Sequence, residues 1–555
     1  MQVAVWGALL VATIILSLQD YQAYQLGTHY DDARYVILTQ SLIHSDRYGM
    51  INVPGQPGSA PYPFGYPLLL TPFGLLFPDN LDALKVLSLI ATVLNATLLF
   101  WGWRWFSRRS YWWAIAVVGL HALSPLVIDH TRRVMSEPIF TTFCLAAMLL
   151  AEQAARGKQN RGWSLLMSVA LTFVVFTRTI GVVLVISVFA YLLFVIGRRF
   201  WKELLLIVTT MIVLVGLVVG ITPVNPKSLL PSNYFNTKEA SFLVGLGVIT
   251  TSVDPSDLPS SRYTTEDETP TGRGRFDIKL LLTDYFIAGT KQHLGEDLRQ
   301  AILPLGGGPR EQIVAERIGI PSLPILVGVF TFGLIVLGYF RWFVQEGLSV
   351  FNLYAILYSG ALFLWVWKGP RLLYPIQAQL HFGFLLGIEA VLSWAAAFRG
   401  RTNSVRKFRN GVLASAVFIL LLLSVRSSLK IDDSRLHTGD LQARTTWLKA
   451  NTTPCDIIMT GAPPIDFMYS GRKTVYQPGS LASTGELEDY LAKHGVDYIL
   501  IAPRIEWQPS YIPSYSDRTT GLLSLIADLI SESRVMLVYS SEQDLIKVFK
   551  IQPQK

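Results

Sequence analysis

Charged residues are scarce in this sequence. They make up 15% of the 555 residues, whereas hydrophobic residues make up 51% and the mean hydropathy is +0.39. A chain of this length could form several soluble domains, but this composition indicates that the lipid bilayer is its main solvent. Cysteine is almost absent. Cys144 and Cys455 are too far apart in the expected topology to pair, so we expect no disulfide and no cysteine-based metal site.

Other patterns are missing as well. The sequence shows neither the short alternating strands of a membrane barrel nor heptads or internal repeats. Gly306–Gly308 lacks the preceding strand and the Lys-Ser/Thr of a phosphate-binding loop, so cytoplasmic nucleotide binding has no support. The net charge of +8 does not indicate nucleic acid as a partner, because the Lys and Arg residues mostly lie in short loops between apolar runs.

Apolar runs of roughly 20 residues, the length that crosses ~30 Å of hydrocarbon as a helix, recur from end to end. We read the first run as a span and not as a signal peptide, because no basic segment precedes it. The sequence therefore predicts a polytopic α-helical membrane protein with about eleven transmembrane helices. The expected spans are 3–18, 81–103, 112–128, 137–154, 163–177, 179–197, 203–222, 321–340, 349–367, 374–397 and 411–428.

Basic residues in the connecting loops set the orientation, because cytoplasmic loops carry an excess of Lys and Arg. They predict a multi-pass plasma-membrane protein with a cytoplasmic N-terminus and an extracytoplasmic C-terminal part. Segments 19–80 and 222–321 are then outer loops. In the first, the proline-studded run Pro63–Phe77 is too short and broken for a span and is expected to be re-entrant or interfacial. The basic loop residues are Arg104, Arg108, Arg109, Arg156, Lys158, Arg161, Arg198, Arg199, Lys202, Arg341, Arg399, Arg401, Arg406, Lys407 and Arg409.

From residue 438 onward the pattern is that of a soluble domain. Expected strands alternate with expected helices, which is typical of a small α/β domain. We therefore divide the chain into a transmembrane module, 1–428, and an extracytoplasmic α/β domain, 429–555, whose sequence shows no catalytic set. The expected strands are 456–460, 497–502, 534–539 and 545–551, and the expected helices are 441–451, 484–494 and 522–533.

Two adjacent carboxylates, Asp31 and Asp32, follow the first span. They could simply begin a helix, where Asp side chains accept hydrogen bonds from free N–H groups. They could instead serve as a general base or a metal ligand, because apolar surroundings raise the pKa of a carboxylate and so favour proton acceptance.

Three further groups of polar residues lie at the expected outer surface. Arg132 and Arg133 depart from the positive-inside pattern and form either a salt-bridged turn or a site for a phosphate group, while the nearby Glu137 could simply begin the fourth span. Arg178 interrupts apolar sequence, where a charge needs a partner, a ligand or a path to the interface. Arg371 could contact anionic lipid or the anionic part of a lipid-linked substrate.

In this order, the outer-loop motifs resemble those of the GT-C glycosyltransferases that use polyprenyl-phosphate sugars, the superfamily of protein O-mannosyltransferases and the lipid A aminoarabinose transferase. Tyr30–Tyr35 is similar to the acidic element of the family's first outer loop, and Pro63–Leu69 to its Pro-Pro-Gly-Tyr-Pro-Leu-Leu element. Met135–Pro138 resembles the acidic motif before the fourth span, and Arg371–Pro375 resembles a late Arg-Tyr element. The resemblance covers most of the chain.

The resemblance implies a GT-C-like fold and an inverting transfer of sugar from a polyprenyl-phosphate donor to a hydroxyl of a glycan, lipid or protein acceptor. Asp31 would be the general base, with Asp32 as the alternative. Glu137 would orient the acceptor or help to hold a metal. Metal use varies across the superfamily, so the cofactor stays unknown. The implied substrate-binding residues are Arg132, Arg133, Arg178, Arg371, Tyr374 and Tyr66.

Two other functions stay open. A transporter or flippase for a lipid-linked substrate would be expected to bury charges at mid-membrane in discontinuous helices related by repeat symmetry, whereas the acidic residues here cluster in outer loops. A noncatalytic protein of an assembly or polymerase complex is the third reading. Loss of transfer in an Asp31→Asn variant that still folds would distinguish the enzyme from both.

Overall fold

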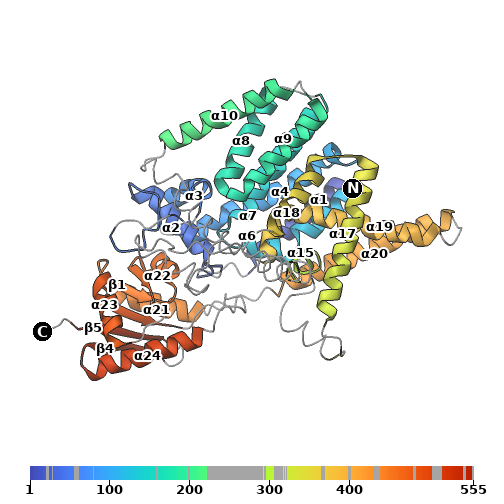
Figure 1. Ribbon diagram of the computed structural model, residues 1–555. Helices are drawn as coiled ribbons and strands as arrows, with labels where there is room; N and C mark the ends of the chain where they lie inside the picture. The colour runs from blue at the N-terminus through green and yellow to red at the C-terminus, as the bar shows by residue number, and fades with distance from the viewer. Residues whose placement is uncertain are drawn as a thin grey trace, which may run out of the picture. The chain divides into compact units, whose positions relative to one another are not determined.

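The computed structural model (Figure 1) describes residues 1–19, 24–27, 29–55, 60, 62–78, 80–157, 161–197, 200–221, 290, 292, 296–304, 317, 319, 322–363, 369–397, 402–430, 438–478, 483–502, 515–541 and 546–552. These residues form two compact units. The first takes the described residues of Met1–Tyr21, Lys85–Ile221 and Asp277–Ile431, and the second takes those of Gln22–Leu84 and Asp432–Lys555. Most of the predicted outer loop 222–321, with Gly306–Gly308, lies outside the described residues.

The first unit is a bundle of helices. Every predicted span coincides with a helix, or, for 112–128, with the pair α5 and α6, which is bent by 58°. Among the described residues, six helices are long and apolar enough to cross a membrane, or seven with the bent pair, so the count of eleven is not confirmed. The α-helices are α1 (Gln2–Leu18), α4 (Lys85–Phe106), α5 (Tyr111–Ala122), α6 (Pro125–Thr131), α7 (Ser136–Ala155), α8 (Arg161–Thr177), α9 (Val182–Ile196), α10 (Phe200–Ile221), α15 (Leu298–Ile302), α17 (Leu323–Glu346), α18 (Val350–Phe363), α19 (Gln377–Ala397) and α20 (Thr402–Ser428); two 3₁₀ segments are η2 (Thr179–Gly181) and η7 (Pro370–Ile376).

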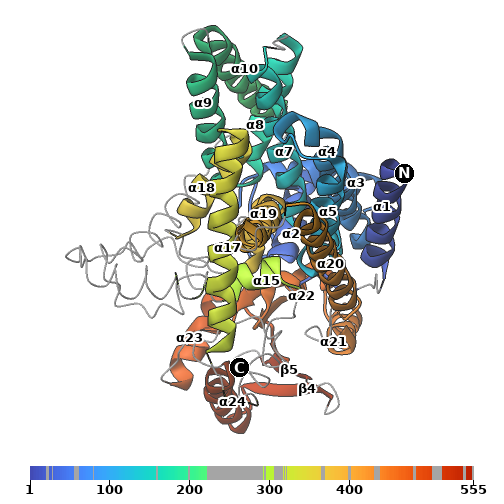
Figure 2. The same cartoon turned by 90° about the vertical axis from the view of Figure 1, so that its right-hand side faces the viewer.

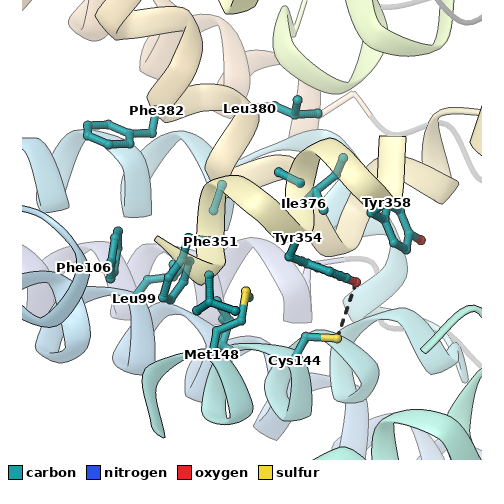
Figure 3. Packing of buried hydrophobic residues seen from close by; sticks show 14 of the residues in the cluster. Leu99, Phe106, Cys144, Met148, Phe351, Tyr354, Tyr358, Ile376, Leu380 and Phe382 are labelled. Atoms are coloured by element: carbon teal, nitrogen blue, oxygen red, sulfur yellow. Dashed lines mark hydrogen bonds between the residues drawn. The ribbon is translucent and has the colours of Figure 1, made fainter. Parts of the chain in front are cut away.

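The interior of this bundle is packed with aromatic and aliphatic side chains from α4, α7, α18 and α19 (Figure 3). The rings of Phe106 and Phe351 stack with centroids 4.0 Å apart. Cys144 is fully buried beside Tyr354, with its sulfur 3.7 Å from the tyrosine hydroxyl, whereas Cys455 is exposed. Both cysteines are free thiols.

Helices α17 and α19 lie side by side (Figure 2) and approach each other through glycines. A Cβ added at Gly338 would lie 1.7 Å from the carbonyl oxygen of Gly383, and one at Gly387 would lie 2.0 Å from the carbonyl oxygen of Leu334. Gly383 and Gly387 are four residues apart on α19, the small-residue spacing that lets two membrane helices bring their backbones together. This contact fixes α19, which follows the segment carrying Arg371.

Three arginines from loops that were predicted to share one membrane face meet at one carboxylate. Arg109, Arg341 and Arg409 lie 3.0, 3.4 and 3.8 Å from Glu389 on α19. Each arginine follows or precedes a different predicted span, so this meeting supports the prediction that these loops lie at the same end of the bundle. Which membrane face that end occupies stays a prediction.

The second unit contains a five-stranded sheet of order β2-β1-β3-β5-β4. β1 pairs in parallel with β2 and with β3, while β5 is antiparallel to β3 and β4. The strands are β1 (Ile457–Thr460), β2 (Lys473–Tyr476), β3 (Tyr498–Ile501), β4 (Val535–Ser541) and β5 (Ile546–Ile551); the helices are α2 (Asp31–His44), α3 (Gly65–Leu76), α21 (Thr438–Asn451), α22 (Pro463–Ser470), α23 (Thr484–His494) and α24 (Tyr515–Ser531), with the 3₁₀ turn η1 (Leu81–Leu84).

Side chains along the strands alternate between the two faces of the sheet and so contribute to two separate hydrophobic cores. Ile499 and Ile501 of β3 face a cluster that includes α23 and α24, whereas Tyr498 and Leu500 face a cluster that includes Leu448 of α21. Helices therefore cover both faces of the sheet (Figure 1), which confirms the predicted α/β domain. The predicted strands and helices of this domain are all present. α22 and β2 were not predicted, because each is short and the prolines that begin α22 resemble a loop.

The first of the segments predicted to be outer loops joins this domain through hydrogen bonds. The Thr474 amide of β2 donates to the carbonyl of Asn52 at 2.8 Å, and Lys473 Nζ donates to the carbonyl of Ile51 at 2.5 Å. The Tyr469 hydroxyl of α22 donates to the carbonyl of Leu26 at 3.0 Å. Residues Gln22–Leu84 were predicted to belong to the transmembrane module, but their contacts group them with the C-terminal domain.

Substituting Gly338 by Ala should lower the free energy of unfolding by about 1–3 kcal/mol or more, because the added methyl group meets backbone and not a movable side chain. Thermal unfolding of the purified protein in detergent measures the change. Gly333→Ala, on the same helix with nothing within 4 Å of the added Cβ, is the matched control and should be neutral or slightly stabilising. Equal effects of the two substitutions would contradict the close approach.

Candidate active site

The first predicted carboxylate, Asp31, is the first residue of α2. The Tyr62 hydroxyl donates a hydrogen bond to Asp31 Oδ1, and Arg34 Nη1 lies 3.8 Å from the same oxygen. Arg34 Nη1 also donates to the Tyr62 hydroxyl at 3.3 Å. The Asp31 side chain keeps 13% of its surface exposed, so it is held in place by neighbours and yet accessible.

Tyr62 donates to Asp31 over a wide pH range. Burial raises the pKa of Tyr62 well above its ordinary value, and the neighbouring charge of Asp31 raises it further. The phenol therefore stays protonated, and the carboxylate is the group that accepts. Sequence reasoning missed this residue, although its place between Pro61 and Pro63 was a signal that its backbone is restricted.

The second carboxylate, Asp32, has a different environment. It is fully buried and accepts hydrogen bonds from the Gly27 amide at 2.8 Å and the Ala33 amide at 2.9 Å. Gly27 has φ +110°, and its Cα faces Ile465 so closely that an added Cβ would lie 3.0 Å from that side chain. Asp32 thus fixes the loop before α2. This structural function is close to the alternative in which the two aspartates begin a helix and accept hydrogen bonds from free N–H groups.

Tyr66 lies in the second predicted motif and is fully buried in α3. Its ring meets the ring of Tyr35 edge-on at 4.8 Å, and Tyr35 in turn lies 4.7 Å from the ring of Tyr62. These rings join α3 to α2. The arrangement places Tyr66 in the packing that supports the Asp31 turn.

In the first unit, Glu137 and Arg178 form a close ion pair. Arg178 Nη1 lies 2.5 Å from Glu137 Oε1 and donates to the Ser136 hydroxyl at 3.1 Å. Glu137 sits in the first turn of α7, where the helix dipole favours a negative charge, and its side chain is 2% exposed. Of the three alternatives for Arg178, the structure shows a partner within the protein, and 20% of the Arg178 side chain stays exposed.

Arg371 also acts electrostatically on the Glu137 carboxylate. It is half-buried and is the second residue of η7, a segment that begins directly after Gly369, which has φ +137°. The Gly369 amide donates to the buried Asp297 carboxylate at 3.0 Å, so Asp297 fixes the turn that carries Arg371. Tyr374 of the same segment is fully buried, with its ring 5.4 Å from that of His130 and 5.7 Å from that of His121.

The remaining two predicted cations are buried. Arg132 is 1% exposed and donates to the carbonyl of Leu16 at 2.6 Å, which joins the end of α6 to α1. Arg133 donates to Asp129 at 3.0 Å, and its carbonyl accepts from Ser88 at 2.7 Å. These contacts agree with the salt-bridged turn, the structural alternative for this segment. Across the part of the chain that the structure describes, no group of three or more His, Cys, Asp or Glu side chains is placed to hold a metal ion.

Solved structures with this architecture are known. ArnT from Cupriavidus metallidurans in the apo state aligns over 100% of both chains with a TM-score of 0.55 at 12% identity. The same protein bound to undecaprenyl phosphate aligns over 99% of both chains with a TM-score of 0.54 at 10% identity. The archaeal oligosaccharyltransferase AglB from Archaeoglobus fulgidus, in complex with an inhibitory peptide and a dolichol-phosphate, aligns over 90% of this chain and 69% of its own with a TM-score of 0.52 at 10% identity.

The chain has the GT-C fold. Together with its apolar helices, this fold makes it a multi-pass membrane protein. The sequence model of the dolichyl-phosphate-mannose-protein mannosyltransferase family matches residues 71–224 of this GT-C chain. A curated relative, the undecaprenyl phosphate-alpha-4-amino-4-deoxy-L-arabinose arabinosyl transferase of Edwardsiella ictaluri (strain 93-146), is 33% identical over 135 residues. The matched stretch spans 23% of this chain and 24% of that relative.

The Glu137–Arg178 pair should show an interaction free energy of about 1–3 kcal/mol in a double-mutant cycle. The cycle uses Glu137→Gln, Arg178→Gln and the double variant, with thermal unfolding in detergent as the measurement. Either single change removes the ion pair and leaves one charged group behind. The double variant should therefore lose less stability than the sum of the losses of the two single variants. The control is the pair Glu488 and Arg534 in the C-terminal domain, which is partly exposed and 2.6 Å apart, with an expected coupling below about 1 kcal/mol. Additive losses at Glu137 and Arg178 would contradict the pairing.

Proposed function

We propose that this GT-C protein is a glycosyltransferase. It transfers a sugar from a polyprenyl-phosphate donor to an acceptor hydroxyl on the extracytoplasmic side of the membrane. The partial family match, the arabinosyl transferase activity for which the curated relative is named, and the solved structures in complex with undecaprenyl phosphate and dolichol-phosphate support this assignment. The observation that carries it is the Asp31 carboxylate, accessible and yet held by Tyr62 and Arg34 in the first outer segment.

Asp31 is the proposed general base. Its carboxylate takes the proton from the acceptor hydroxyl while the acceptor oxygen forms a bond to the anomeric carbon of the sugar. The bond from that carbon to the phosphate oxygen breaks, and polyprenyl phosphate leaves with the electron pair. Attack opposite the leaving phosphate inverts the anomeric configuration. Tyr62 and Arg34 stabilise the carboxylate in its ionised, proton-accepting form because both interact with Oδ1.

Asp31, and not Asp32, fits this role. A general base must come within hydrogen-bond reach of the proton that it removes. Asp31 keeps part of its surface accessible, whereas Asp32 is fully buried and accepts two backbone N–H bonds that hold the loop. We therefore assign the base to Asp31 and the support of its loop to Asp32.

Arg371 is the proposed partner of the leaving phosphate, because a fixed cation stabilises the negative charge that develops there in the transition state. Its turn is fixed by Asp297, and Glu137 acts on both Arg371 and Arg178. Glu137 would then orient these guanidinium groups. Arg132 and Arg133 fit this function less well, because their side chains are buried and committed to Leu16 and Asp129.

Asp31→Asn should reduce sugar transfer by about 10²- to 10⁴-fold without loss of folded protein, because the amide cannot accept the hydroxyl proton. Radiolabelled sugar transfer from a panel of polyprenyl-phosphate sugars in purified membranes measures this. Asp46→Asn, an exposed carboxylate of the same outer segment, is the control and should keep full activity. Asp32→Asn should instead lower the yield of folded protein.

Full transfer by the Asp31→Asn protein would refute Asp31 as the base. Absence of transfer by the wild type with every donor of the panel would refute the glycosyltransferase assignment and favour transport or assembly. The anomeric configuration of the product, determined by NMR, tests inversion separately, and a retained configuration would exclude a single displacement.

A further inference from the structure

The residue before Asp31 has an unusual backbone conformation. Tyr30, the N-cap residue of α2, has φ 61° and ψ −38°, one of three non-glycine residues with positive φ among those that the structure describes. Such a conformation costs about 1–3 kcal/mol and persists only where the surroundings hold it. Because Tyr30 directly precedes Asp31, its backbone sets the direction in which the Asp31 side chain leaves the helix.

Two contacts hold the side chain of Tyr30. Its hydroxyl shares a hydrogen bond of 2.6 Å with the hydroxyl of Tyr476, and the Arg34 guanidinium lies over its ring, 4.6 Å from the centroid. Arg34 also lies 3.8 Å from Asp31 Oδ1. The Tyr30 ring therefore connects Tyr476, which is 446 residues away in the sequence, to the two residues that surround the carboxylate.

Tyr476 is itself firmly held by the C-terminal sheet. It is the last residue of β2 and lies opposite Thr460 in the register with β1. Its carbonyl accepts a hydrogen bond of 2.7 Å from the hydroxyl of Tyr490 on α23. Two residues earlier, Thr474 bonds to Asn52 of the outer segment through both its amide and its hydroxyl. A hydroxyl placed on a strand end in this way is a more precise support than one on a loop.

We propose that Tyr476 is a positioning residue for Asp31. Through its hydrogen bond to Tyr30, it keeps the first turn of α2 in the strained conformation that directs the carboxylate. The C-terminal domain is then a working part of the catalytic unit, in addition to any part that it has in binding an acceptor. The catalytic consequence rests on the proposed function, whereas the effect on the α2 turn does not.

The first test removes one oxygen atom. Tyr476→Phe keeps the ring and the strand but loses the hydrogen bond to Tyr30, so we expect kcat to fall by about 3- to 10-fold with KM for the donor unchanged. Tyr30→Phe removes the same bond from the other side and should give a similar loss. The double variant should be no slower than either single one. Tyr539→Phe is the matched control, because Tyr539 lies on β4 at the opposite edge of the sheet, and it should behave as wild type.

The second test does not need activity. Backbone hydrogen exchange of residues 30–35 should be faster in Tyr476→Phe than in the wild type or Tyr539→Phe, while exchange in β1 and β3 stays unchanged and shows that the domain remains folded. Unchanged exchange at 30–35 in Tyr476→Phe would overturn the proposal. Faster exchange with wild-type kcat would overturn it too, because the turn would then not control Asp31. A wild type without transfer activity would refute the proposed function and leave the exchange experiment to decide whether Tyr476 holds the turn.

Discussion

Hydrocarbon offers no hydrogen-bond partner, so a polar group in the helical unit must find its partner within the protein. This requirement explains many of the contacts in that unit. Arg178 pairs with Glu137, and Arg132 donates to a backbone carbonyl of α1. Glu152 accepts from the Tyr191 hydroxyl and from the Val350 amide, both at 2.9 Å, so one carboxylate joins α7, α9 and α18. Each such contact joins helices that apolar packing alone would leave free to slide, because lipid chains are as apolar as the side chains.

The same requirement explains why arginines with a catalytic function and arginines with a structural function are hard to distinguish in this unit. Three arginines look alike in the sequence, and placing each charge there costs free energy. They are Arg132, Arg178 and Arg371. Arg132 is committed to a carbonyl and buried, whereas Arg178 and Arg371 both act electrostatically on the Glu137 carboxylate and stay partly accessible. A cation becomes available to an anionic substrate only where its structural partner leaves part of the guanidinium uncovered.

The second unit depends on contacts between distant parts of the chain. The segment that carries Asp31 binds to α22 and β2 through Leu26, Ile51 and Asn52. The partners of Ile51 and Asn52 lie 422 residues later in the sequence. Such contacts form late, because the intervening chain must be made and its loop closed first. The proposed support of the Asp31 turn by Tyr476 therefore couples the proposed base to the integrity of the C-terminal domain.

The sequence by itself determined where the long apolar helices of the bundle and four of the five strands of the C-terminal domain lie, because apolar runs and alternation are local properties of the chain. It also singled out Asp31, Glu137 and Arg371 as candidate site residues through motifs in the predicted outer loops. Only the tertiary structure distinguished Asp31 from the buried Asp32, assigned Arg132 to the packing of α1, and brought Tyr62 and Tyr476 to the Asp31 turn. The physical reason is that burial and hydrogen-bond partnership depend on residues far apart in the sequence, which no local pattern records.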